Sequence, residues 1–178
     1  IHSNGLTLLY KSNVSPFEWI QSPVVYYEFN GFKTSFMTMI GNYFDARRHA
    51  HHYLGIVRSK IEDLQRETMK LKSLFYILRS LLAADWNITY RSYVPMTLAE
   101  LSVLLPDVVK IEVLEMQLLK SQVDEGFIYN CSATIRNYIE TRLIDLAHQV
   151  KQVPVSVSDK EGLENYFKTV LRLSLIHI

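Results

Sequence analysis

The stretch KLKSLFYILRSLLAADW, residues 70–86, constrains the fold more than any other part of the chain, because its apolar residues recur at the helical period. Apolar residues at positions 71, 75, 78 and 82 line one side of the predicted helix. A second stripe, about a quarter-turn away, carries Lys72, Tyr76, Arg79 and Ala83. The pattern predicts a helix over residues 70–84 that buries one face and carries an ordered cationic and aromatic row beside it.

Comparable patterns predict helices over most of the remaining sequence. They cover residues 16–21, 34–43, 45–67, 97–105, 108–122 and 129–150, and a final helix is expected to begin at Ser158 or Asp159. The stretch 24–44, which includes the helix expected over 34–43, is rich in β-branched and aromatic residues and also has the propensity of a strand. Thr97 and Glu100 have the spacing of a capping box, and Pro106 stops the segment that they open. Residues 86–96 are expected to form a loop closed by Pro95. The sequence thus predicts an all-α fold, an irregular bundle of about six or seven helices.

Composition excludes several classes of partner. The net charge is +1, with acids and bases interspersed, so the chain lacks the basic excess that duplex DNA or an anionic membrane attracts. No apolar run approaches the ~20 residues needed to span a bilayer, and the first residues lack the zones of a signal peptide. The single cysteine, Cys131, fits a reducing compartment, which makes the cytoplasm the expected location.

Two other clusters of polar residues are weighed as candidate chemistry. Within HAHHY, only His49 and His52 have the helical spacing to share a metal ion, and packing against Tyr53 or a neighbouring loop is the preferred interpretation. Glu112 and Glu115 lie one turn apart, but such a pair is typical of a solvated helix face. Since no nucleophile or phosphate-binding glycine loop is present, we predict no catalytic residue and no metal ligand in this chain.

The row of Lys72, Tyr76 and Arg79 has two interpretations that the residues alone leave open. In one, the cations extend to water at the edge of a buried helix and the tyrosine bridges core and solvent. In the other, the row binds the phosphate and base of a nucleotide: lysine offers a compact charge, arginine a two-pronged fork and tyrosine a flat face for stacking.

Several longer blocks resemble a known family. The blocks are LLYKSNVSPFEWIQSPVVY, HHYLGIV, KLKSLFYILRSLLAADW and VLEMQLLKSQVDEGF. They are similar to successive segments of predicted nucleotidyltransferases of the DNA polymerase β superfamily, of the RNA-repair-pathway type, and the resemblance covers residues 5–171. The matching residues are Glu18, Trp19, Ser22, Pro23, Tyr26, His52, Tyr53, Lys72, Tyr76, Leu78, Arg79, Leu82, Trp86 and Lys120.

The resemblance implies one part of a two-part enzyme. Its N-terminal catalytic domain would carry a Gly-Ser motif and acids that bind divalent metal, Mg²⁺, and its helical domain would complete the cleft for an NTP and for an RNA end or small nucleotide acceptor. In this chain the resemblance assigns Lys72 and Arg79 to phosphate and Tyr76 to orienting the sugar or base. The expected partners are therefore the NTP, the acceptor and the chain's own catalytic domain.

This sequence departs from the family pattern in ways that set the expected domain boundaries. The Gly-Ser motif and its Asp-x-Asp carboxylates are absent, Ser80 stands where proline is usual, and Asp85 stands where a basic residue is usual. Residues 1–15 are therefore expected to be the remnant of a junction with a missing catalytic domain, 16–173 a helical domain, and 174–178 a non-native tail. The chain alone is expected to be inactive, with the metal site outside it.

A different class of function is a helical interaction module without nucleotide chemistry. In that interpretation, the aromatic residues of the N-terminal part pack against another protein. These residues are Trp19, Tyr26, Tyr27, Phe29 and Phe32.

Overall fold

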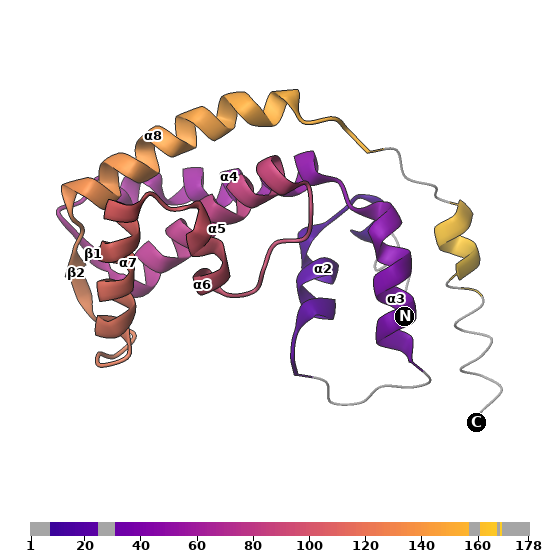
Figure 1. Cartoon of the computed structure of the whole chain (residues 1–178), viewed down its shortest axis with the longest axis horizontal. Coiled ribbons are helices and arrows are strands. Elements are labelled where there is room, and N and C mark those ends of the chain that lie inside the picture. The colour runs from indigo at the N-terminus through magenta and orange to yellow at the C-terminus, as the bar shows by residue number, and fades with distance from the viewer. Residues whose placement is uncertain (1–7, 25–30, 157–160, 167, 169–178) are drawn as a thin grey trace.

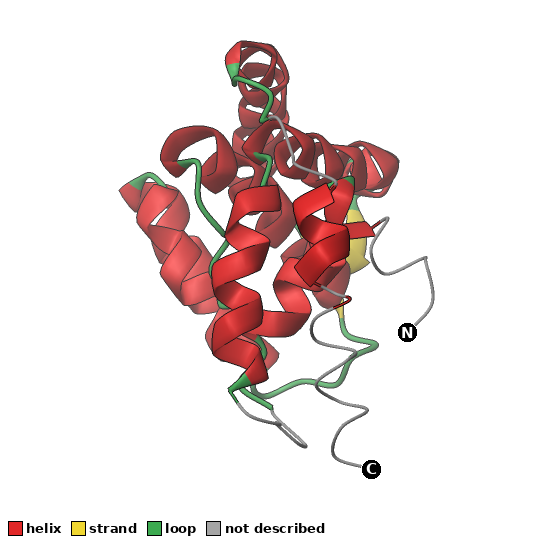
Figure 2. Ribbon diagram, turned by 90° about the vertical axis from the view of Figure 1, so that its right-hand side faces the viewer, coloured by secondary structure: helices red, strands yellow, loops and turns green. Residues whose placement is uncertain are grey.

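The computed structural model describes residues 8–24, 31–156, 161–166 and 168, and these residues are mostly helical (Figures 1 and 2). The described helices are α2 (Val14–Gln21), α3 (Phe32–Ile40), α4 (Ala46–Leu64), α5 (Leu71–Tyr90), α6 (Leu98–Leu101), α7 (Asp107–Lys120) and α8 (Ala133–Gln149). Short 3₁₀ turns follow α3, α6 and α8, at Gly41–Tyr43, Ser102–Leu104 and Val150–Gln152. The predicted all-α irregular bundle is confirmed.

The main core lies between α4, α5, α7 and α8, with α8 running along one side of the α4–α5 pair (Figure 1). The apolar stripe predicted on α5 is its centre, because Leu71, Leu78 and Leu82 are each at most 2% exposed and Phe75 is 7% exposed. Burying side chains of this size stabilises the fold by about 1.5–3 kcal/mol each. The stripe therefore fixes which side of α5 remains available to ligands.

A second, smaller core joins α2 and α3 to the helical residues 161–166 (Figure 1). Its buried members are Leu9, Phe17, Ile40, Tyr43 and Leu163. Helix α3 begins after Gly31, whose φ of 66° is a left-handed conformation that glycine adopts without steric cost. This core holds α2 beside the main bundle, where Glu18 of α2 reaches α4 and α5.

Side-chain caps define where several helices begin. Asp45 accepts a hydrogen bond from the backbone N–H of Arg48 at 3.0 Å and starts α4, and Ser132 starts α8 in the same way through Ile135 at 3.1 Å. The capping box predicted for Thr97 and Glu100 is confirmed. It opens only one turn of α-helix, because residues 102–104 tighten into a 3₁₀ turn.

A small antiparallel sheet, absent from the prediction, positions the start of α5. Strand β1 (Thr68–Lys70) pairs with β2 (Ile128–Asn130), with Met69 opposite Tyr129. The backbone N–H of Leu71 then donates to the carbonyl of Phe127 at 3.0 Å. Because this pairing ties the chain before β2 to the first turn of α5, it brings Glu125 beside Lys72.

Several predicted boundaries are wrong, and three of them follow from neighbouring structure. Helix α5 continues to Tyr90, into the loop expected over residues 86–96, because Asn87 is fully buried and Trp86 donates from its indole to Ser92 Oγ at 3.0 Å. The helix expected from residue 129 begins at Ala133, since 128–130 form β2. Helix α3 ends at Ile40 and a 3₁₀ turn completes the segment to Tyr43.

Some predictions concern residues outside the ranges that the structure describes. Ser158 and Asp159, the expected cap of the last helix, and the tail 174–178 lie outside the described residues. The domain boundaries and the cytoplasmic location stay predictions. None of the helices in the described ranges has both the length and the apolar character needed to cross a membrane.

Candidate functional site

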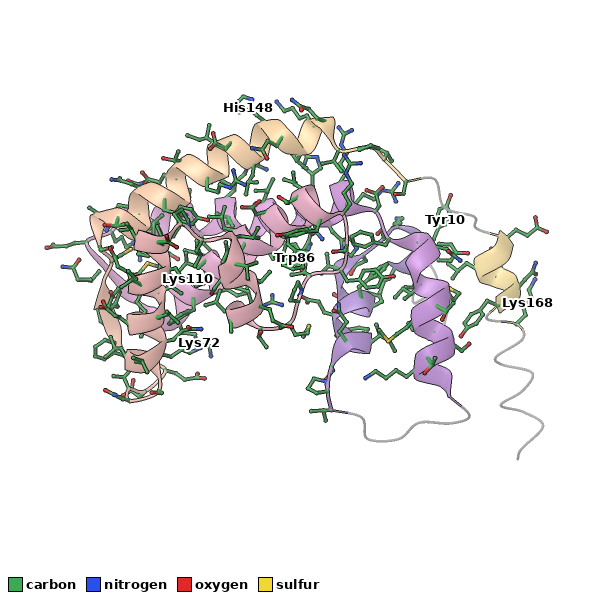
Figure 3. All side chains as sticks on the ribbon, in the orientation of Figure 1. Tyr10, Lys72, Trp86, Lys110, His148 and Lys168 are labelled. Atoms are coloured by element: carbon green, nitrogen blue, oxygen red, sulfur yellow. The ribbon has the colours of Figure 1, made fainter. Side chains whose placement is uncertain are left out.

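The predicted residues Lys72, Tyr76 and Arg79 line one hollow, on the side of α5 that the buried stripe leaves uncovered. Lys72 and Tyr76 are exposed, and the side chain of Arg79 is 27% exposed. We call this hollow the first hollow, and its volume is about 440 Å³. Figure 3 shows Lys72 on the opposite side of the bundle from His148 of α8. Its remaining lining residues are Lys60, Ser73, Phe75 and Lys120.

Helices α4 and α7 add two cations that the sequence analysis did not select. Lys60 comes from α4 and Lys120 from the last turn of α7. Lys120 lies over the ring of Phe75, with Nζ 5.0 Å from the ring centroid, which is a cation–π arrangement. Within the part of the chain that the structure describes, neither ammonium forms an ion pair. Lys120 had a signal in the sequence, since it belongs to the family blocks, whereas Lys60 had none.

Arg79 is held by a carboxylate from α2. Both of its terminal nitrogens lie 3.4 Å from Oε1 of Glu18, longer than the about 2.7–2.9 Å of a tight charge-assisted hydrogen bond. The hydroxyl of Tyr53 donates to the same oxygen at 2.9 Å. Burial, followed by the charge of Glu18, raises the pKa of Tyr53, so this tyrosine remains a neutral donor. The guanidinium therefore has one loosely held partner and donors left for a ligand.

Lys72 forms an exposed ion pair with Glu125, with Nζ 2.8 Å from Oε2. The hydrogen bond from Lys72 lowers the pKa of Glu125. Both side chains are largely solvent-exposed, and pairs of this kind contribute little to stability. A phosphate group entering the hollow can therefore replace Glu125 at low cost. In total, four cations line the first hollow, and only two of them, Lys72 and Arg79, are paired with a carboxylate of the described residues, which favours an anionic ligand.

A second hollow of about 510 Å³ adjoins the first. The two hollows share Phe75, Arg79 and Lys120 as a common wall. The remaining lining of the second hollow is uncharged and consists of Leu98, Gln117 and Ser121. We call the two hollows together the groove. Both volumes fall in the range of small-molecule sites, about 300–1,000 Å³.

The described residues around the groove do not fit a bound metal ion. No group of three or more His, Cys, Asp or Glu side chains suited to holding a metal occurs among the described residues. The carboxylates nearest to the predicted row, Glu18 and Glu125, are already paired with Arg79 and Lys72. Glu112, weighed above as a candidate, accepts a hydrogen bond from Ser132 at the start of α8.

The side chains of His49 and His52 pack against different residues. The ring of His49 packs edge-on against Phe17 and Phe44, with centroids 4.7 and 4.8 Å away, and the residue is 2% exposed. His52 packs edge-on against Tyr53 at 5.4 Å. The expected packing against Tyr53 or a neighbouring loop is confirmed for both, since Phe44 lies in the loop before α4.

Comparison with known proteins gives one curated relative and one family. The chain is 28% identical over 160 residues to YcgL of Bacillus subtilis (strain 168), which is described as an uncharacterized protein. The match covers 86% of this chain and 60% of the relative, so the chain spans about three-fifths of that protein. No solved structure matches significantly. The family model that matches residues 3–169 is RlaP, and the chain therefore belongs to the RNA repair pathway DNA polymerase beta family.

Proposed function

We propose that the chain provides the NTP-binding groove of a nucleotidyltransferase that passes a nucleotidyl group from an NTP to an RNA end or a small nucleotide acceptor. Family membership supports a nucleotidyltransferase-like function in general. The observation that carries the finer proposal is the meeting of four cationic side chains, from three helices, with Tyr76 in one hollow. A triphosphate needs this excess of positive charge, and a nucleoside needs a flat aromatic face.

In the proposed complex, three of the cations bind phosphate and Tyr76 contacts the nucleoside. Arg79 presents its planar fork to two oxygens of one phosphate, while Lys72 and Lys120 act as point charges on others. Tyr76 is 51% exposed, which leaves its ring accessible for stacking on the base or sugar. These residues bind and orient the nucleotide. None of them is assigned a proton transfer.

We further propose that the metal-binding carboxylates belong to an N-terminal catalytic domain that these 178 residues do not include. The match covers 60% of YcgL, which leaves room for a further domain in that relative, and the Gly-Ser and Asp-x-Asp motifs are absent from these residues. On this basis the chain alone, given Mg²⁺ and radiolabelled NTP, should incorporate no nucleotide. Incorporation of nucleotide would contradict the proposal that the metal-binding carboxylates lie outside these residues.

The test of the groove is a thermal melt of the chain with ATP and Mg²⁺. At 100-fold excess over Kd, ATP should add about 2.7 kcal/mol of stability. Arg79→Ala should weaken ATP binding about ten-fold or more, because hydrogen bonds to charged groups contribute about 1.5–3 kcal/mol. Lys72→Ala should weaken it less, since Lys72 must first leave Glu125. Glu125→Gln should strengthen it, because it frees Lys72 and removes a negative charge.

The matched control is Lys151→Ala, which removes one exposed positive charge from a residue that lines neither hollow. ATP should stabilise this variant as it does the wild type. Equal weakening by Lys151→Ala and Arg79→Ala would mean that only general charge attraction is at work. No stabilisation of any of the proteins by ATP would reject the NTP site in the first hollow.

An interaction module remains the second candidate function, because a row of apolar side chains on α7 is exposed. Val108, Ile111 and Leu118 are 64%, 59% and 66% exposed, and Trp19 of α2 is 70% exposed. Tyr26, Tyr27 and Phe29 lie outside the described residues. A chain that fails to bind ATP while retaining its fold would favour this candidate.

A further inference from the structure

The second hollow is a separate compartment with chemistry unlike that of the first. Beyond the shared wall of Phe75, Arg79 and Lys120, the first hollow adds two lysines, a serine and a tyrosine, whereas the second adds a leucine, a glutamine and a serine. A polyphosphate is matched by the first set. A ligand with a single anionic group and a neutral body is matched by the second.

Gln117 gives the second hollow its recognition chemistry. Its side-chain amide forms no hydrogen bond with the described residues, although the residue is partly buried. An amide presents one donor and one acceptor side by side, and this pattern complements the edge of an adenine base. Since an unpartnered amide lining a hollow gains hydrogen bonds when a ligand enters, Gln117 favours a nucleobase over a purely apolar ligand.

The other two side chains complete a nucleoside-sized surface. Ser121 donates its hydroxyl proton to the carbonyl of Leu118 at 2.7 Å, so its oxygen is left to accept a hydrogen bond from a ligand. Leu98, at the start of α6, supplies an apolar contact for a base or sugar. The shared Arg79 and Lys120 lie at the boundary, where one phosphate of a second ligand would meet the phosphates of the first.

We infer that the second hollow is a distinct site for a nucleoside monophosphate, held with its phosphate on Arg79 and Lys120 and its base on Gln117. The inference rests on the proposed function, because it assigns the second hollow to the small nucleotide acceptor and the first to the NTP. The shared wall then places the two ligands' charged groups side by side. A single nucleotide lying across both hollows is the competing arrangement.

The experiment measures the Kd of ATP with Mg²⁺ and the Kd of AMP separately, by titration calorimetry, for the wild type and for two variants. Gln117→Leu should weaken AMP about ten-fold or more, by the loss of the amide hydrogen bonds, and leave ATP within two-fold. Tyr76→Ala should weaken the binding of ATP and leave the Kd of AMP within two-fold. Gln122→Leu makes the same chemical change at an exposed position on the turn that follows α7 and should alter neither Kd. A melting curve checks that every variant is folded.

Each outcome decides between the arrangements. Weakening of both ligands by Gln117→Leu would show one nucleotide lying across both hollows, and it would overturn the inference. An unchanged AMP affinity in Gln117→Leu, or no AMP binding by the wild type, would overturn it as well. If AMP binds through Gln117 while ATP does not bind at all, the proposed NTP site fails and the monophosphate site stands.

Discussion

His49 shows how one residue can suggest chemistry in the sequence and serve packing in the structure. Three histidines within four positions raised the question of a metal, yet the ring of His49 lies against Phe17 and Phe44 in the interior. Its Nε2 is buried and has no hydrogen-bond partner among the described residues. Burial, followed by the charge of His52, lowers the pKa of His49 to about 4, against the opposing effects of Asp45 and the backbone of Ser12.

A pH dependence of stability follows from this pKa. The unfolded chain takes up a proton at His49 near pH 6.5, whereas the folded chain resists it until about pH 4. The stability that His49 contributes by staying neutral is therefore fully present above pH 6.5. As the pH falls from 6.5 to 4, the free energy of unfolding decreases by about 3 kcal/mol in all. Urea unfolding at pH 7 and pH 4.5 measures this decrease. His49→Asn, which cannot titrate, should show a smaller difference between the two pH values, and an equal difference in both proteins would contradict the assignment.

The row of Lys72, Tyr76 and Arg79 was visible in the sequence because helical spacing alone places these residues beside the buried stripe of α5. Their partners were not visible. Glu18 and Glu125 lie 61 and 53 residues away from Arg79 and Lys72 along the chain, and tertiary packing alone brings them together. Lys60 reaches the hollow for the same reason.

At the scale of elements, an ion pair between a buried aspartate and a partly buried arginine joins α5 to α8. The guanidinium of Arg142 donates from Nε and Nη2 to both oxygens of Asp85, at 2.8 and 2.7 Å. Asp85 is 1% exposed and also accepts from Thr89 Oγ1 at 3.1 Å. The hydrogen bond to Asp85 raises the pKa of Arg142. The acidic residue noted in the sequence as a departure from the family pattern is thus the partner of an arginine on α8.

Removal of one partner should cost more than removal of both. Arg142→Leu leaves an uncompensated buried carboxylate and should lower the free energy of unfolding by about 3–5 kcal/mol. The double variant Asp85→Leu/Arg142→Leu should recover most of this loss, because apolar residues replace both charges. Chemical denaturation of the two single variants and the double variant measures the coupling. Additive losses would show that the pair does not act as a unit.

The elements that the sequence analysis missed are those whose formation depends on tertiary contacts. Residues 86–90, WNITY, are weak helix formers, yet α5 includes them because Asn87 is buried and donates to the carbonyl of Ser92 at 3.0 Å. Strands β1 and β2 have three residues each, which is too short for an alternating pattern to be recognised in the sequence. By contrast, the long α4 and α7 were predictable from their apolar periodicity.

At the scale of the whole molecule, the groove depends on four helices meeting. Helix α5 supplies the predicted row, α4 supplies Lys60, α6 supplies Leu98, and α7 supplies Lys120 and Gln117. The main core fixes α4, α5 and α7 relative to one another, and the small core fixes α2, which carries Glu18. The site was therefore predictable in part: its central row from one helix, its other walls only from the assembled fold.

The central claim is that a nucleotide binds in this groove, and nuclear magnetic resonance of the ¹⁵N-labelled chain titrated with ATP and Mg²⁺ tests it most directly. We predict that saturable amide shifts concentrate in residues 72–79, with further shifts around Lys60 and Lys120, and that Arg79→Ala raises the ATP concentration at half-saturation about ten-fold or more. Shifts confined to other helices, or none at saturating ATP, would contradict the account.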